Sequence, residues 1–313
     1  MEDLLGFGKS TDKIIEAVSK AVGAIYRPYG MRREADAEAY RLLTLERAKA
    51  EAKAEELDRR LPIGSEYRTR LVRADTTAQL EERIRQRQAS EALRQQHNID
   101  SVVQAAIDEG TSTDSEEEID LDWLNSFFDL AKDVSVEQMQ VIWGKVLAKE
   151  IGRPGSFTIR SLETLKRMTR REAVTFSSAC KLASKFMGGD KRMILTGWVT
   201  GGVWRNLFGA SRKTLKLDRF GVGFLEIKNL ADIGLLYEEE LFLGPLRKGN
   251  EVDVELPASR LIIKARKGKI QLTNVQFTPT GSELAVLVPP EESPEYISAL
   301  REMLSDMFVV ANG

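Results

Sequence analysis

Two long stretches with few apolar residues constrain the fold more than any other feature of the sequence. They run from Met31 to about Leu61 and from about Glu66 to Gln96, with a break at Pro62, and are rich in Ala, Glu, Arg, Lys and Leu, which favour helices. Apolar positions this sparse cannot bury a core of their own. The pattern therefore predicts a long helical arm over residues 31–108, a coiled-coil-like hairpin whose seam packs on another subunit or on the C-terminal body. We accordingly expect a homo-oligomer.

Residues 1–30 predict a short amphipathic helix between Thr11 and Tyr26. Such a helix either docks on the rest of the fold or lies on a membrane surface or a partner. Its polar face carries both acids and bases, which favours docking. The apolar positions that would make either contact are Ile14, Ile15, Val18, Val22 and Ile25.

An acidic segment without apolar periodicity, residues 109–120, predicts a linker. After it, residues 121–188 show helical apolar spacing and capping signals and predict a helical bundle. Residues 189–313 mix strand and helix patterns, with strands expected at residues 235–243, 252–256, 261–265 and 270–277. They predict an α+β module with an ending similar to a winged helix. The expected fold class is mainly α with a C-terminal α+β part: a long N-terminal helical hairpin, a central helical bundle and a winged-helix-like module.

The sequence offers little chemistry for catalysis. A single cysteine, Cys180, and a single histidine, His97, exclude a disulfide framework and a zinc site built from several such residues. His97 is expected to lie at a helix break, and Cys180 is expected to be a buried thiol. The sequence therefore predicts no catalytic residue, no metal and no cofactor, although chemistry by paired carboxylates stays open.

The ends of the sequence and its hydropathy predict a cytoplasmic protein. The chain opens on acidic residues where a signal peptide carries basic ones, and no apolar run is long enough to span a membrane.

Charge is unevenly distributed along the chain. Residues 109–150 hold eleven acidic and three basic side chains, whereas residues 151–313 have a net charge of +6. An excess of positive charge favours an anionic partner such as DNA or RNA. The candidate phosphate contacts fall in two clusters, one beside Trp204 and one around a glycine turn: Arg205, Arg212, Lys213, Lys216 and Arg219, and then Lys264, Arg266, Lys267 and Lys269.

The segment from Asp120 to Phe176 resembles a known bacterial family. Three of its motifs are similar to the family catalogued as domain of unknown function 2806: DLDWLNSFFDL, VSVEQMQVIW and EIGRPGSF. The resemblance extends over about residues 83–310 and includes LADIGLL and LTNVQFTPTGSEL. The N-terminal IIEAVSKAVGAIYRPYGMRREADAEA is loosely similar to the start of abortive-infection alpha proteins. These resemblances imply a protein of prophage or antiphage-defence regions, and supply no catalytic residue.

Together these patterns predict a non-enzymatic interaction or sensor protein in phage–host conflict, binding nucleic acid or a phage or host protein through its basic C-terminal module. One alternative is a membrane-acting abortive-infection effector that uses the helix from Thr11 to Tyr26 for peripheral membrane contact. Another is an unrecognised hydrolase or nuclease that depends on carboxylates.

Overall fold

The structure is a computed structural model that describes residues 11–19, 65–110, 117–186, 189, 191–200 and 211–313, with backbone only for residues 65–78. The first predicted stretch of the arm, residues 31–61, lies outside the described residues, as do Val22, Ile25 and Arg205. The chain divides into two compact units, Met1–Gly155 (unit 1) and Ser156–Gly313 (unit 2).

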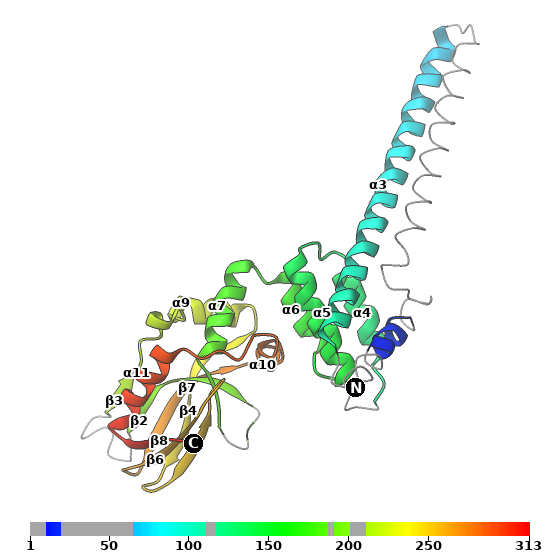
Figure 1. Cartoon of the computed structure of the whole chain (residues 1–313). Coiled ribbons are helices and arrows are strands. Elements are labelled where there is room, and N and C mark those ends of the chain that lie inside the picture. The colour runs from blue at the N-terminus through cyan, green and yellow to red at the C-terminus, as the bar shows by residue number, and fades with distance from the viewer. Residues whose placement is uncertain (1–10, 20–64, 111–116, 187–188, 190, 201–210) are drawn as a thin grey trace. The chain divides into compact units, whose positions relative to one another are not determined.

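Unit 1 is helical in its described part. It contains a helix over residues 11–19, then α3 (Ser65–Glu109), α4 (Leu121–Ala131) and α5 (Glu137–Gly152) (Figure 1). The side chains of residues 79–94 of α3 are exposed, whereas its C-terminal part packs on α5. Phe127 is the aromatic centre of the core, with its ring 5.3 Å from both Trp123 and Trp143. Fully buried side chains complete this core: Ile14, Val18, Val102, Val103, Ala106, Leu124, Val146 and Leu147.

The helix break expected at His97 was wrong, because α3 continues unbroken to Glu109. Asparagine competes for backbone hydrogen bonds and so suggests a break. Here the Asn98 side chain turns away from its own helix and donates to the carbonyl of Lys132 at 2.8 Å, in the connection between α4 and α5. Gln140 of α5 donates to Asn98 Oδ1 at 3.3 Å. The buried amide thus ties three segments together instead of ending α3.

The acidic segment 109–120 does not coincide with the division between the units. Residues on both of its sides belong to unit 1, since α3 packs on α5, and the division falls after Gly155. The predicted bundle over residues 121–188 is accordingly shared, with α4 and α5 in unit 1 and its remaining helices in unit 2. Its last residues, Ala183–Phe186, form a strand rather than a helix.

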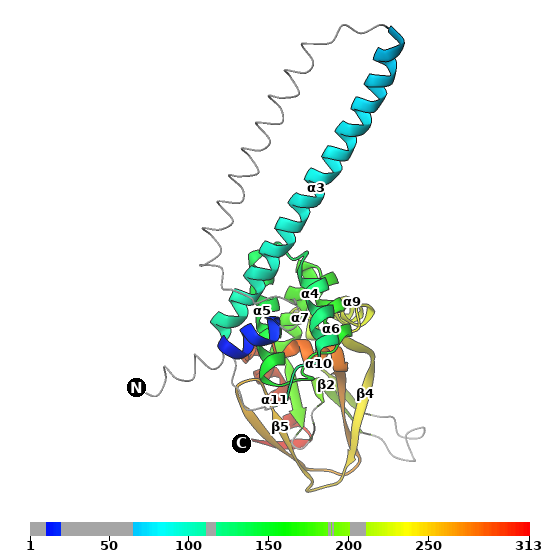
Figure 2. The same ribbon diagram turned by 90° about the vertical axis from the view of Figure 1, so that its right-hand side faces the viewer.

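Unit 2 is built on one antiparallel sheet with strand order β4-β7-β2-β1-β5-β6-β8, and β3 pairs with β2 beside β1. Figures 1 and 2 show α7, α9 and α10 gathered toward one end of this sheet. The α+β class is confirmed, and the winged-helix identity is not. The helices are α6 (Ile159–Arg167), α7 (Arg170–Lys181), a 3-10 turn η1 (Leu217–Phe220), α9 (Phe224–Asp232), α10 (Pro279–Ala285) and α11 (Pro294–Ser305). The strands are β1 (Ala183–Phe186), β2 (Arg192–Thr200), β3 (Arg212–Thr214), β4 (Leu236–Leu246), β5 (Glu251–Glu255), β6 (Arg260–Ala265), β7 (Ile270–Phe277) and β8 (Phe308–Asn312).

Helix α11 is fixed to the central strand β2 by two buried aromatic side chains. The Tyr296 hydroxyl donates to the carbonyl of Leu195 at 2.9 Å, and Trp198 Nε1 donates to the carbonyl of Met303 at 3.0 Å. Both aromatic rings therefore bury apolar area and still satisfy their polar atoms. This pairing holds the C-terminal helix on one face of the sheet, so that β8 can follow and close the edge beside β6.

Helices α6 and α10 are joined by the carboxylate of Glu283. Its Oε2 accepts from the Thr158 amide at 2.7 Å, from the Thr158 hydroxyl at 3.0 Å and from the Ser161 hydroxyl at 2.5 Å. Alanine at position 283 removes all three bonds and leaves the Thr158 amide without its acceptor, while the Thr158 and Ser161 hydroxyls keep each other as partners at 3.1 Å. The free energy of unfolding is therefore expected to fall by about 1–3 kcal/mol. Urea titration measures this loss. Alanine at Glu163, an exposed residue of α6, is the control and should leave stability within about 0.5 kcal/mol; equal effects at both positions would contradict the assignment.

Candidate nucleic-acid interface

Two turns, each connecting strands that do not pair with each other, lie side by side at the end of the sheet away from α7. The first turn, residues 247–250, joins β4 to β5, and the second, residues 266–269, joins β6 to β7. They are linked through backbone hydrogen bonds, from the Gly249 amide to the Ala265 carbonyl at 2.8 Å and from the Ala265 amide to the Asn250 carbonyl at 2.9 Å. The antiparallel pairing of β5 with β6 thus brings both turns to one place, at the lower end of the sheet in Figures 1 and 2.

The residues that close the first turn are suited to its backbone conformation. Asn250 Oδ1 accepts from the Arg247 amide at 2.6 Å, which closes the first turn locally. Gly249 has φ +85°, a conformation that glycine adopts without strain. The side chains flanking these positions are left to point into solvent.

Five cationic side chains lie on these two turns, and all five are exposed to solvent. We call them the basic tip: Arg247, Lys248, Arg266, Lys267 and Lys269. None of them forms an ion pair with any residue that the structure describes. Arg266 is the most firmly placed, since its Nε donates to the Phe308 carbonyl at 3.1 Å.

Nearby carboxylates are already paired with other cations. Lys264 Nζ lies 2.7 Å from Glu251, Lys213 Nζ lies 2.5 Å from Asp306, and Arg212 lies 2.5 Å from Glu240. The charge of the basic tip therefore stays uncompensated, which is the condition for attracting an anion at the surface.

The structure separates the residues that the sequence proposed as phosphate contacts. Arg266, Lys267 and Lys269 fall in the basic tip, whereas Arg212, Lys213 and Lys264 are engaged in the ion pairs described above. Lys216 and Arg219 are exposed at η1, apart from the two turns. Arg205 lies outside the described residues. The sequence-based prediction thus named three members of the tip.

Arg247 and Lys248 were missed by the sequence-based prediction. Their signal was present, because Gly249 and Asn250 are turn residues placed between two strand patterns. The strand pattern of the first of these strands ends at Leu243, whereas β4 continues to Leu246 and carries both cations to the turn.

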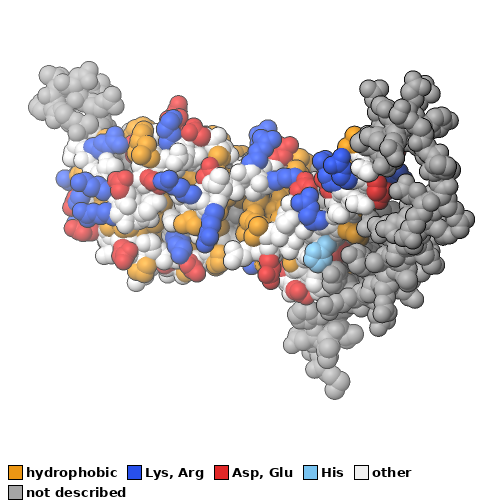
Figure 3. Space-filling model, turned by 90° about the horizontal axis from the view of Figure 1, so that it is seen from above, with side chains coloured by type: hydrophobic (Ala, Val, Ile, Leu, Met, Phe, Trp, Pro, Cys, Tyr) orange, Lys and Arg blue, Asp and Glu red, His pale blue; other side chains and the backbone are white. Residues whose placement is uncertain are grey.

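The described part of the face seen from above has mixed character (Figure 3). The view in Figure 3 shows basic, acidic and hydrophobic side chains interspersed, without a large area of one charge. An interspersed surface attracts a polyanion less than a cluster of one sign does. This contrast favours the basic tip over the face seen from above.

The apolar residues proposed as a membrane or partner contact are placed only in part. Ile14 and Val18 are fully buried and Ile15 is half-buried. This burial agrees with a helix that docks on its own chain. No helix in the described part of the chain is long and apolar enough to cross a membrane.

Titratable side chains do not gather into a metal site in the described residues, where no group of three His, Cys, Asp or Glu side chains could hold an ion. Cys180 is buried, and burial raises the pKa of its thiol to about 12. The thiol is therefore neutral at physiological pH, as the sequence predicted for a buried cysteine.

Comparison with known proteins bears on the family alone. No curated protein and no solved structure matches the chain. The likeness of the N-terminus to abortive-infection proteins is not shown. A family model does match residues 82–301, close to the range over which the sequence resembled it, and covers more than half of the chain. The chain belongs to the family described as protein of unknown function (DUF2806).

Proposed function

We propose that this chain is a non-enzymatic binding protein that contacts the phosphate backbone of nucleic acid through the basic tip. The observation that carries the proposal is the convergence of two turns with five exposed, unneutralised cations. Lysine and arginine on neighbouring turns can each reach a different phosphate of one backbone, and the release of counterions then supplies affinity. Side chains on turns contact the phosphates and do not place a helix against the base edges in a groove. The binding is therefore expected to be independent of base sequence.

Substitution of three tip residues should weaken this binding strongly. Arg247, Lys248 and Lys267 have no side-chain hydrogen bond to any described residue, so glutamine at each position removes charge without removing a structural contact. Each lost phosphate contact reduces affinity by up to about tenfold at about 0.1 M salt. The triple variant R247Q/K248Q/K267Q is therefore expected to bind a labelled duplex DNA or single-stranded RNA at least tenfold more weakly, as measured by fluorescence anisotropy.

A control with the same change of charge separates the site from general electrostatics. Arg167, Arg170 and Arg171 are exposed at the junction of α6 and α7. The variant R167Q/R170Q/R171Q should bind within about twofold of the wild type. Equal weakening in both variants, or no binding by the wild type at micromolar concentration, would refute the proposal. Binding of anionic vesicles by the wild type in place of both nucleic acids would also refute it.

The membrane-acting alternative is not favoured by the described structure, and the carboxylate-dependent hydrolase or nuclease stays a prediction from the sequence. A membrane-acting role for the N-terminal helix requires apolar side chains on its surface, whereas Ile14 and Val18 are buried. Assembly through the long helices, a cytoplasmic location, the winged-helix identity and a role in phage–host conflict stay predictions from the sequence.

A further inference from the structure

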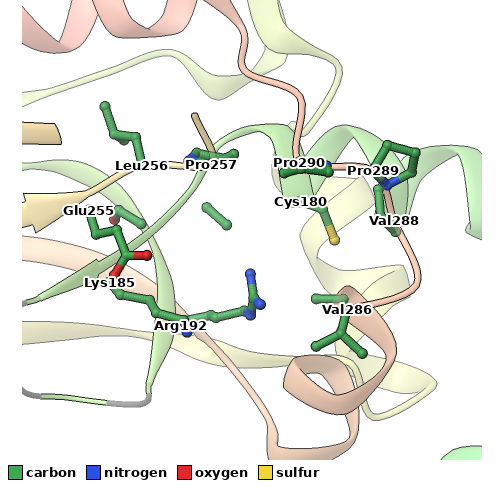
Figure 4. A pocket seen from close by; sticks show the side chains of 13 residues that line it. Cys180, Lys185, Arg192, Glu255, Leu256, Pro257, Val286, Val288, Pro289 and Pro290 are labelled. Carbon is green, nitrogen blue, oxygen red and sulfur yellow. The ribbon is translucent and has the colours of Figure 1, made fainter. Parts of the chain in front are cut away.

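A pocket of about 280 Å³ lies within unit 2, away from the two turns. Strands β1 and β2, the end of α7, the end of β5 and the segment that follows α10 surround it (Figure 4). The basic tip makes no use of it, so its chemistry can be considered separately from nucleic-acid binding.

The polar wall of the pocket is a row of charged residues across three strands. Lys185 of β1 pairs in register with Arg192 of β2 on one side and with Glu255 of β5 on the other. Residues paired directly across antiparallel strands point to the same face of a sheet, so all three line the pocket together. Figure 4 shows the guanidinium of Arg192 extending into the space that Cys180 and Val286 border.

These two cations are available to a ligand. Neither Lys185 nor Arg192 forms an ion pair with a described residue, although each is partly removed from solvent. The charge of Arg192 reaches the pocket's interior, where it opposes the rise in the pKa of Cys180 that burial causes. A pair of half-buried cations without partners attracts an anion more strongly than exposed ones do.

The remaining wall is apolar. It is formed by side chains that cannot hydrogen-bond: Leu256, Pro257, Val286, Val288, Pro289 and Pro290. The pocket therefore joins a charged wall to an apolar one, and a concavity in which a few polar groups converge beside apolar side chains can orient a small organic molecule. The neutral thiol of Cys180 adds to this apolar wall and offers no nucleophile.

We propose that this pocket binds a small monocarboxylic acid, with its carboxylate on Arg192 and Lys185 and a short apolar body against the proline-rich wall. The planar guanidinium of arginine matches the two oxygens of a carboxylate. Two cations and the one carboxylate of Glu255 leave a single positive charge, which a monoanion neutralises, whereas a doubly charged phosphate ester would leave one negative charge uncompensated and partly removed from water.

Three probes with the same carbon chain test the charge preference. Hexanoate, hexanol and hexyl phosphate are titrated against the full chain, and the melting temperature is followed by scanning fluorimetry. Hexanoate is expected to raise the melting temperature by about 2 °C or more and to saturate, because only the folded state binds it. Hexanol should give no shift, and hexyl phosphate a smaller one. Equal shifts with hexanoate and hexanol, or no shift with hexanoate, would overturn the proposal.

Matched variants locate the binding. Arg192→Gln should abolish the hexanoate shift, whereas Lys191→Gln, at the exposed neighbouring residue outside the pocket, should keep it. Val286→Trp offers a second route, because position 286 is 42% exposed and the larger ring would fill the pocket from its rim. This variant should keep the unliganded melting temperature and lose the hexanoate shift. A shift that persists in both pocket variants would place the ligand elsewhere.

Discussion

Alanine in place of Gly144 is expected to destabilise unit 1 by about 2–4 kcal/mol, although alanine is the better helix former. Helices α3 and α5 cross at this glycine. A Cβ at position 144 would lie 2.6 Å from the Cβ of Ala105 and 2.8 Å from the amide nitrogen of Ala106. The gain in helix propensity is about 1 kcal/mol. Atoms closer than their contact distance force the two helices apart, and overpacking of a buried seam costs more than that gain.

Separation of the helices should be visible where they meet. Hydrogen exchange of G144A is expected to rise in peptides from the C-terminal part of α3 and from α5, with a lower melting temperature. Lys149→Ala, at an exposed position of the same helix, is the control and should change stability by less than about 0.5 kcal/mol. A melting temperature of G144A equal to or above that of the wild type would contradict the close crossing of α3 and α5.

Alanine in place of Gly281 should have an effect of similar size in unit 2. Gly281 lies in the first turns of α10, and a Cβ there would be 2.0 Å from the carbonyl oxygen of Leu235. That carbonyl already accepts from the Thr278 amide at 3.0 Å, and the Thr278 hydroxyl donates to the Gly234 carbonyl at 2.6 Å. Because these hydrogen bonds hold the backbone of residues 234–235 and of Thr278 in place, the added methyl group can be accommodated only if they break. We expect a loss of about 3 kcal/mol in the free energy of unfolding.

The neighbouring position provides the comparison for Gly281. Ser282 is half-buried on the same helix, and Ser282→Ala should cost no more than about 1 kcal/mol. Urea titrations of both variants, with exchange of the 278–285 and 234–236 amides, measure the difference. If G281A unfolds at the same urea concentration as S282A, the contact between α10 and Leu235 is not as tight as the structure describes.

Local patterns predicted much of the fold. Helical spacing located α4 and α5, although α5 begins after Val136 without the side-chain cap that the sequence suggested, and the strands expected at residues 252–256, 261–265 and 270–277 appear as β5, β6 and β7. The packing of α3 on α5, which lie on either side of the acidic segment, could not be predicted. It depends on the close approach of Gly144 to Ala105, and these residues are far apart in sequence. The Asn98 side chain shows the same limit, since its partners at Lys132 and Gln140 become visible only in the folded chain.

The basic tip was predicted in part for a related reason. A run of cations around Gly268 is evident in the sequence, whereas its proximity to Lys248 follows from the pairing of β5 with β6. Strand register likewise places Arg192, Lys185 and Glu255 side by side in the pocket, and no motif in the sequence indicates this arrangement. Charge composition indicates the sign of a partner, and sheet topology decides which charges act together.

The salt dependence of nucleic-acid binding tests the basic tip most directly. Affinity for one duplex is measured over a range of salt concentrations for the wild type, R247Q/K248Q/K267Q and R167Q/R170Q/R171Q. Each phosphate contact contributes about −0.9 to the slope of log affinity against log salt. The tip variant should have a slope shallower by about 2–3, and the control should keep the slope of the wild type. Identical slopes for the tip variant and the wild type would contradict nucleic-acid binding through this tip.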